Sequence, residues 1–225
     1  MVNNYSGESA YTHDIASSYE NDRRVEEHWR KEQCYAEKLI QAMPDGSRVL
    51  DLPVGTGRFI EYYQAKDIQV VGIDISESML LEAGKKVASS SIKLGLGDAR
   101  VLDYPDNAFG YVLCWRLLHL LPPDILREVV CELARVASGK LYIQAYVRDH
   151  WYYPLKFKRI IGRVLSKIRA PLKSRKKPWS HIQSHEHSEA MLIRLFSDCG
   201  LRINAIDILG LYGALKVKVF VLEKV

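Results

Sequence analysis

Cysteines are few in this sequence, and none belongs to a paired motif. The four cysteines, at positions 34, 114, 131 and 199, lie far apart, and no C-x-x-C pair occurs. This spacing favours neither a metal centre built on cysteine pairs nor a disulfide framework. Scattered cysteines are typical of a reducing compartment, so the sequence predicts a cytoplasmic protein.

Long apolar runs are also missing. No run approaches the roughly 20 apolar residues that a membrane-spanning helix requires. The polar start of the chain, MVNNYSGESAYTHD, lacks the apolar centre of a signal peptide. We therefore expect neither a membrane span nor a secretory leader. With 225 residues, 48% of them hydrophobic, the chain is long enough for one globular domain with a substantial core.

Acidic residues are missing from one segment. Residues 155–177 contain ten Lys or Arg and no Asp or Glu, whereas the whole chain has a formal net charge of +5. Apolar positions recur at helical spacing from 155 to 170, which predicts a basic amphipathic helix. Such a helix binds an anionic membrane surface, an acidic glycan or nucleic acid, or it packs on its own domain. The lack of acidic residues favours an anionic partner.

A glycine-containing loop follows the first predicted strand. The sequence from Arg48 to Arg58 is RVLDLPVGTGR, in which a short apolar run ends at Asp51 and a helix begins after Gly57. Glycines in such a turn let the backbone approach a ligand, and the start of a helix offers free N–H groups. A dinucleotide site would need a third glycine, but Ile60 stands at that position. The loop predicts a site for another small molecule.

This loop resembles motif I of the class I S-adenosylmethionine-dependent methyltransferases. Asp51, Gly55 and Gly57 match the family pattern, while Pro53 replaces its usual first glycine and removes a backbone N–H. The resemblance implies a Rossmann-like α/β fold, with a seven-stranded, mostly parallel sheet, an antiparallel last strand and helices on both faces. It also implies that S-adenosylmethionine is the cofactor and that these four residues contact it.

The next predicted strand ends in a second acid. Asp74 follows the apolar run VVGI and lies 23 positions after Asp51. An acid in this position accepts hydrogen bonds from ribose hydroxyls. Ser76 supplies an N-cap for the next helix, which leaves Asp74 for a ligand. The stretch VVGIDIS resembles the second motif of the same family, so Asp74, Ile75 and Met79 are expected at the cofactor.

Two further strand ends complete the expected cofactor site. The third strand, from Ile92, runs into Asp98 and Ala99, which by resemblance face the adenine ring; a turn-forming Gly-Asp pair is the alternative interpretation. The fourth strand leads to Cys114 and Trp115, which are expected at the cofactor, and the stretch from Trp115 to Leu121 is expected to line the cavity for cofactor and acceptor.

The chain before the first strand is expected to cover the site. Residues 9–43 have a helical pattern, and Ala16 and Tyr19 resemble the A-x-x-Y lid of small methyltransferases. Tyr19 and Arg23 are therefore candidate cofactor contacts, and a helix packed on the sheet is the alternative. The predicted organisation is a lid at residues 1–45, a cofactor-binding core at 46–149 and 188–225, and a basic insertion at 150–187.

Histidines supply the candidates for a catalytic base. Imidazole titrates near neutral pH, so it can remove the proton of a hydroxyl acceptor. His185 and His187, near the end of the insertion, are preferred over His119, which lies in an apolar run and is more typical of a packed core residue. No metal is expected, since no cysteine lies near these histidines and methyl transfer needs no Lewis acid.

Together these features predict an S-adenosylmethionine-dependent methyltransferase. The favoured reaction is O-methylation of a hydroxylated, anionic or membrane-associated acceptor, such as an envelope glycan or glycolipid. Residues 155–177 would then contact lipopolysaccharide or the anionic inner membrane peripherally. A small metabolite and RNA are alternative acceptors, although the N-P-P-[YF] motif of base methylation is missing after the fourth strand. A non-catalytic, cofactor-binding sensor or scaffold remains the third hypothesis.

Overall fold

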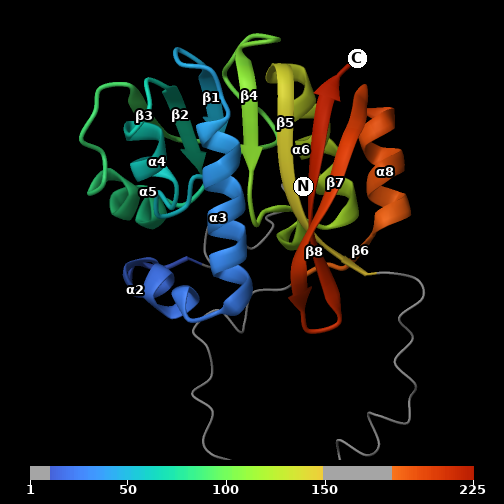
Figure 1. Cartoon of the computed structure of the whole chain (residues 1–225), viewed down its shortest axis with the longest axis horizontal. Helices are drawn as coiled ribbons and strands as arrows, with labels where there is room; N and C mark the ends of the chain where they lie inside the picture. The colour runs from blue at the N-terminus through green and yellow to red at the C-terminus, as the bar shows by residue number, and fades with distance from the viewer. Residues whose placement is uncertain (1–10, 149–183) are drawn as a thin grey trace, which may run out of the picture.

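In the computed structural model of this protein, residues 11–148 and 184–225 are described, and their strands form one mixed sheet. Seven strands lie in the order β3-β2-β1-β4-β5-β8-β7, and the short strand β6 pairs with the end of β5 (Figure 1). The strands are β1 (Arg48–Asp51), β2 (Gln69–Asp74), β3 (Ile92–Leu96), β4 (Phe109–Cys114), β5 (Ala137–Arg148), β6 (His187–Ser188), β7 (Leu201–Tyr212) and β8 (Leu215–Lys224).

Most neighbours in this sheet are parallel. From β3 to β5 every pairing is parallel, whereas β8 runs antiparallel to both β5 and β7. The predicted Rossmann-like α/β fold with an antiparallel last strand is thus confirmed. The strand order reverses between β1 and β4, and in open α/β sheets ligands bind at such a point, beyond the carboxyl ends of the strands.

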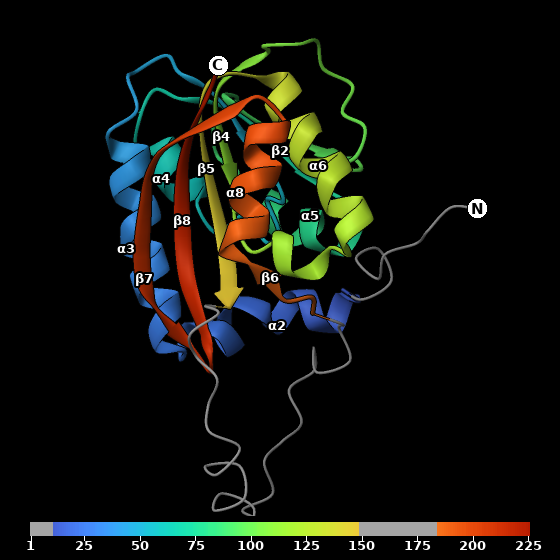
Figure 2. The same cartoon turned by 90° about the vertical axis from the view of Figure 1, so that its right-hand side faces the viewer.

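Helices cover both faces of the sheet, and Figure 2 shows α3 on the side opposite to α6 and α8. The helices are α2 (His13–Arg24), α3 (Glu27–Gln41), α4 (Ile60–Gln64), α5 (Glu77–Gly84), α6 (Pro123–Val136) and α8 (Glu189–Asp198). One core cluster joins α3, α4 and α5 to the sheet, and another joins α6 and α8 to it.

Strand alternation explains how one sheet has two cores. Val49 and Val70 face the cluster of α3 to α5, while their neighbours Leu50 and Val71 face the cluster of α6 and α8. All four side chains are buried. Because a central parallel strand is covered on both faces, its successive inner positions are apolar, as the runs in the sequence indicated.

The N-terminal helical region is broken into two helices, although the sequence predicted a continuous helical stretch from residue 9 to residue 43. The helix α2 ends at Arg24, and α3 begins at Glu27 after Val25, which is 81% exposed. Figure 1 shows the result: α3 lies along the sheet, whereas α2 crosses beneath the edge at which β2 and β4 end. The break places α2 over the site.

One prediction about the cysteines is wrong. Cys131 of α6 and Cys199, which follows α8, form a disulfide with a Cα–Cα distance of 4.9 Å. They are 68 residues apart in sequence and meet because both helices pack on the same face of the sheet. Cys34 is exposed and Cys114 is buried, and both are free thiols.

The predicted basic helix at 155–170 lies outside the described residues, as does most of the insertion 150–187. Among the helices of residues 11–148 and 184–225, none is long and apolar enough to cross a bilayer.

Candidate functional site

The loop after β1 is held against both neighbouring strands. The backbone N–H of Leu52 donates to the Leu113 carbonyl, and that of Val54 donates to the Ile73 carbonyl, both at 2.9 Å. Gly57 has φ +74°, and a Cβ there would lie 2.5 Å from Cδ1 of Ile60. Only glycine fits this turn, because another residue would be strained and would collide with the helix that follows.

Asp74, at the end of β2, lies beside this loop. Its Oδ2 accepts a hydrogen bond from the Gly55 N–H at 2.8 Å, and its Oδ1 accepts one from the Ser76 N–H at 2.9 Å. Burial raises the pKa of Asp74 to about 6, although these backbone N–H groups oppose the shift. The side chain lines the main cavity, so the remaining lone pairs of its carboxylate are available to ligand hydroxyls.

Asp51, at the end of β1, is placed differently. It is 1% exposed and does not line the cavity. Burial raises its pKa to about 8, and the negative charge of Asp74 adds to this effect. A carboxyl group with such a pKa is mostly protonated at neutral pH. Asp51 is therefore a buried, mostly neutral acid at the start of the loop, and a direct cofactor contact by its side chain stays a prediction.

The end of β3 provides backbone and a small side chain. Gly97 and Ala99 line the cavity. The carboxylate of Asp98, between them, instead accepts a hydrogen bond from Nε of Arg100 at 2.9 Å and another from its backbone N–H, also at 2.9 Å. These bonds hold the pKa of Asp98 below its usual range against the effect of burial. The predicted adenine contacts of Asp98 and Ala99 both stay predictions, and of the two residues only Ala99 lines the cavity.

Helix α2 covers the cavity from the open side. Tyr11 and Tyr19 contribute rings to its lining, 5.9 Å apart. Glu20 fastens the helix, because its carboxylate accepts a hydrogen bond from the Thr56 hydroxyl at 2.9 Å and pairs with Lys86. Arg23 is buried beside Tyr19 and pairs with Glu26, so it lies next to the cavity rather than in its lining.

A buried ionic group adjoins the cavity on the β4–β5 side, and we call Glu32, Arg58 and Arg116 the arginine cluster. Glu32 of α3 has a fully buried side chain, and both arginine side chains are 9% exposed. One carboxylate oxygen of Glu32 lies 2.9 Å from Arg58 and 3.3 Å from Arg116. The other lies 3.4 Å from the Gln144 amide and 3.3 Å from the Tyr146 hydroxyl, both on β5.

Arg116 has an unusual backbone conformation. Arg116 stands two residues after the end of β4. Its φ is +60°, in the left-handed region that arginine rarely adopts. Its backbone N–H donates to the Gln144 side-chain oxygen at 3.0 Å, which holds the turn in place. The turn directs the chain into the short helix η1 (Leu118–Leu120), and Leu117 and Leu120 line the cavity.

The three candidate histidines occupy different positions. His119, in η1, packs edge-on against Tyr146 with ring centres 4.7 Å apart. Its Nδ1 is buried and has no hydrogen-bond partner within residues 11–148 and 184–225. Burial, aided by the positive charges of Arg116 and Arg23, lowers its pKa well below the usual value, so the imidazole is neutral.

His187 and His185 form hydrogen bonds with backbone carbonyls instead. His187 is 2% exposed, lies in β6, and its Nε2 is 2.9 Å from the Leu118 carbonyl. Burial lowers its pKa. The backbone N–H of His185 donates to the His119 carbonyl at 2.7 Å. These contacts position η1, whereas the cavity is lined by other residues.

Comparison with known proteins identifies the family. A family model described as "Methyltransferase domain" matches residues 49–139, from β1 into β5. The magnesium protoporphyrin IX methyltransferase of Synechocystis PCC 6803, solved with S-adenosylhomocysteine, superimposes with a TM-score of 0.67 at 17% identity, over 98% of this chain and 96% of that one. Residues 49–139 thus match a methyltransferase domain, and the fold is that of the class I S-adenosylmethionine-dependent methyltransferases. The predicted family and cofactor are confirmed.

Curated relatives of this methyltransferase act on several kinds of molecule. A phosphatidylethanolamine N-methyltransferase of Cereibacter sphaeroides is 39% identical over 111 residues, which are 46% of this chain and 53% of that protein. A demethylmenaquinone methyltransferase of Desulfitobacterium hafniense is 28% identical over 192 residues, 77% of this chain and 71% of that protein. Against several such relatives the chain spans only about half of their length.

Most of the predicted cofactor residues of this methyltransferase lie together. Those that line the cavity are Tyr19, Pro53, Gly55, Asp74, Ile75, Met79, Ala99 and Trp115. Cys114 does not, because β4 alternates and turns its fully buried thiol into the core beside α6. Trp29, Arg58 and Arg116 also line the cavity. The sequence predicted Arg116 there only as one residue of the stretch 115–121, and it did not single out Trp29 or Arg58. Trp29 belongs to no local motif, and tertiary contacts bring it to the cavity.

Proposed function

We propose that this methyltransferase transfers a methyl group from S-adenosylmethionine to a hydroxyl oxygen of an anionic or membrane-associated acceptor. An envelope glycan or glycolipid is the acceptor class that we favour. The observation that carries the proposal is a neutral, unpartnered imidazole, His119, in the short helix η1, whose neighbours Leu117 and Leu120 line the cavity that also holds Asp74. One half of the cavity suits the cofactor, and the other suits a hydroxyl that must lose a proton.

The residues of the cavity fit the cofactor. Asp74 offers carboxylate oxygens to the ribose hydroxyls, and the glycine loop lets the backbone approach without a Cβ in the way. Tyr19 of α2 and Tyr11, which precedes that helix, close the cavity and keep water out. When bound, S-adenosylmethionine supplies a methyl group whose carbon–sulfur bond breaks as the acceptor oxygen bonds to its carbon, with the electron pair kept by sulfur.

His119 is the base in this proposal, in preference to His185 and His187. Its neutral Nδ1 accepts the proton of the acceptor hydroxyl as the oxygen forms its new bond. His187 has its Nε2 engaged by the Leu118 carbonyl, and His185 is tied through its backbone to His119. The structure thus favours the histidine that the sequence pattern ranked last.

The relatives support a lipid or other small molecule as acceptor over RNA. Phosphatidylethanolamine and demethylmenaquinone appear in the names of two relatives, and a third is a dTDP-amino-sugar dimethyltransferase of Saccharopolyspora spinosa. A small metabolite is therefore the second candidate. The fold also occurs in a [4+2]-cyclase, at a TM-score of 0.64, so the fold alone does not dictate methyl transfer.

The proposal is tested by following the methyl group. Purified protein is incubated with methyl-labelled S-adenosylmethionine and a lysate separated into glycolipid, RNA, protein and small-molecule fractions. We expect label in the glycolipid or the acidic small-molecule fraction, and none with the Asp74→Ala variant. Label in RNA or protein would refute the acceptor class. Absence of label in every fraction, with cofactor binding confirmed by calorimetry, would favour a sensor or scaffold.

A further inference from the structure

The arginine cluster carries an uncompensated positive charge. Two guanidinium groups, from Arg58 and Arg116, share the single carboxylate of Glu32, and all three side chains are at most 9% exposed. Gln144 and Tyr146 add only neutral hydrogen-bond donors to that carboxylate. Glu26, the next carboxylate on this side, already pairs with Arg23 and His28. A buried charge without a partner is costly, so the cluster favours a ligand that brings a negative group.

The two arginines differ in how many of their donors are in use. Arg58 donates from Nη1 to Glu32, from Nε to Gln33 at 2.6 Å and from Nη2 to the Trp29 carbonyl at 2.7 Å. It also stacks 3.5 Å above the Trp29 ring. Its role is structural, because it locks α3 to the loop after β1. All three guanidinium nitrogens already donate hydrogen bonds within the protein, so Arg58 has few donors left for a ligand.

Arg116 has donors to spare. Its one direct contact within the cluster is the 3.3 Å pair from Nη1 to Glu32. Its Nε is buried and has no hydrogen-bond partner in the described part of the chain, residues 11–148 and 184–225. The guanidinium lies 5.4 Å from the Trp29 ring centre and 5.8 Å from that of Tyr146, so aromatic rings flank it. It also lines the cavity. These are the properties of a planar anion receptor.

The position of Arg116 indicates which ligand it meets. Asp74 and Ala99 mark the cofactor end of the cavity, at β2 and β3. Arg116 follows β4, is held by Gln144 of β5, and lies on the other side of the switch point. His119, the proposed base, is three residues further along and shares the Tyr146 ring with it. A group bound to Arg116 is therefore next to the place where the acceptor loses its proton.

We propose that Arg116 anchors a carboxylate or phosphate group of the methyl acceptor and so determines which acceptors this enzyme uses. The inference rests on the proposed function and deepens it. It is independent of residues 155–177, because it stands on side chains inside the fold. The other source of a carboxylate at this site is the amino-acid end of the cofactor, and the experiment must separate the two.

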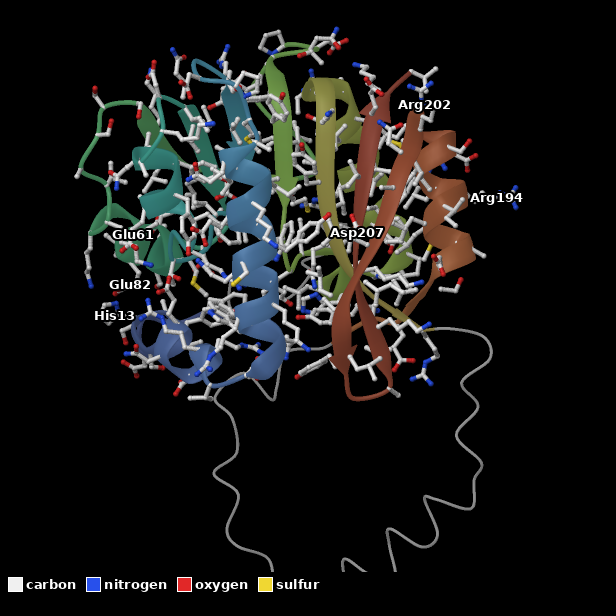
Figure 3. All side chains as sticks on the ribbon, viewed as in Figure 1. His13, Glu61, Glu82, Arg194, Arg202 and Asp207 are labelled. Carbon is white, nitrogen blue, oxygen red and sulfur yellow. A yellow bond between two sulfur atoms is a disulfide. The ribbon has the colours of Figure 1, made fainter. Side chains whose placement is uncertain are left out.

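The test compares Arg116→Gln and Arg116→Lys with the wild type, using the labelled acceptor that the lysate experiment yields. Arg194→Gln is the matched control, since Arg194 is an exposed arginine whose side chain extends outward from α8 (Figure 3). We expect the labelled product to be retained on an anion exchanger. We expect Arg116→Gln to raise the acceptor KM about 30-fold, a typical loss for one charge-assisted bidentate contact. Arg116→Lys should recover part of this loss, and Arg194→Gln should change nothing.

Cofactor affinity distinguishes the two sources of the anion. The Kd for S-adenosylmethionine should stay within about twofold in Arg116→Gln if the acceptor supplies the anionic group. A large rise in that Kd with an unchanged acceptor KM would overturn the proposal and assign Arg116 to the cofactor carboxylate. A labelled product that the anion exchanger does not retain would overturn it as well.

A second measurement keeps this inference separate from the proposed function. Inorganic phosphate is added to the protein loaded with S-adenosylhomocysteine, at constant ionic strength, and thermal unfolding is followed. Phosphate should raise the Tm of the wild type more than that of Arg116→Gln, whether or not any methyl transfer is found. Equal shifts in both proteins would refute an anion site at Arg116, even if the enzyme methylates an acceptor.

Discussion

The two halves of the site are built in different ways. At the ends of β1 and β2, the chain uses backbone atoms, glycines and acids that are close in sequence: Asp74 is bound by the N–H groups of Gly55 and Ser76. At the ends of β4 and β5, it uses long side chains from distant segments. Glu32 meets Arg116 across 84 residues and Tyr146 across 114.

The halves also differ in the sign of their buried charge. The cofactor half holds the carboxylate of Asp74, which is charged above its pKa of about 6, and the proposed acceptor half holds the arginine cluster with its excess positive charge. A cationic sulfonium compound and an anionic acceptor would each find the opposite charge in its own half. This comparison predicts that a substitution in one half leaves binding in the other half unchanged.

The largest effect is expected at His119. Replacing it with Asn removes the proposed base, and loss of a general base lowers kcat by roughly 100-fold or more. The Kd for S-adenosylmethionine should not change, because His119 is not one of the residues that line the cavity. Turnover of the labelled acceptor provides the measurement. His13→Asn, on the exposed start of α2, is the control (Figure 3). Equal kcat in both variants would exclude His119 as the base.

Glu32 is expected to control stability of the acceptor half. Glu32→Gln leaves Arg58 and Arg116 buried without a counter-charge, which should lower the free energy of unfolding by about 3 kcal/mol. Urea unfolding measures this loss. Glu61→Gln is the matched control, because Glu61 is exposed on α4 (Figure 3). A loss below about 1 kcal/mol would mean that the cluster is solvated and that its charge is not uncompensated.

The cofactor half could be predicted from sequence because its parts are local. The apolar run before Asp51, the glycine turn and the acid after VVGI can each be recognised from a few consecutive residues. The sheet could be predicted for a similar reason, since buried parallel strands are continuous apolar runs between helices. Cys114 was predicted at the cavity because it ends a strand, but successive side chains of a strand point to opposite faces, and its thiol lies in the core.

The acceptor half could not be predicted, for the opposite reason. Glu32 is one of several charged residues in α3, and its burial depends on tertiary packing against the loop after β1 and against β5. The break after Arg24 and the Cys131–Cys199 disulfide likewise depend on how helices lie on the sheet. Sequence periodicity shows which face of a helix is apolar. It does not show which charged residue on that helix meets a distant arginine.

Asp74 provides the matching test of the cofactor half. Asp74→Ala removes the carboxylate proposed to bind the ribose, and loss of two charge-assisted hydrogen bonds should weaken S-adenosylmethionine binding by about 100-fold. Calorimetry measures the Kd. Asp67→Ala, an exposed acid before β2, is the control. If the affinity of Asp74→Ala stays within about threefold of the wild type, the ribose assignment is wrong.

The smallest effect is the pH dependence of cofactor binding. With its pKa raised to about 6, Asp74 is a carboxylate above that pH and a neutral acid below it. The ribose hydroxyls donate to the charged form, so the Kd for S-adenosylmethionine should be constant above pH 7 and rise about 10-fold by pH 5. Asp74→Asn should bind weakly with a Kd that does not vary over this range. A wild-type Kd that is equally flat would place the titrating group elsewhere.

The raised pKa of Asp74 makes folding depend on pH in the opposite direction from cofactor binding. Because the folded protein binds the proton of Asp74 more tightly than the unfolded chain does, this group favours folding most at low pH. Its contribution is lost as the pH rises from about 4 to about 6, the range over which cofactor binding improves. Measured without cofactor, wild type should therefore lose more unfolding free energy than Asp74→Asn over that range. Parallel pH curves for the two proteins would contradict the buried, proton-binding carboxyl on which the cofactor half depends.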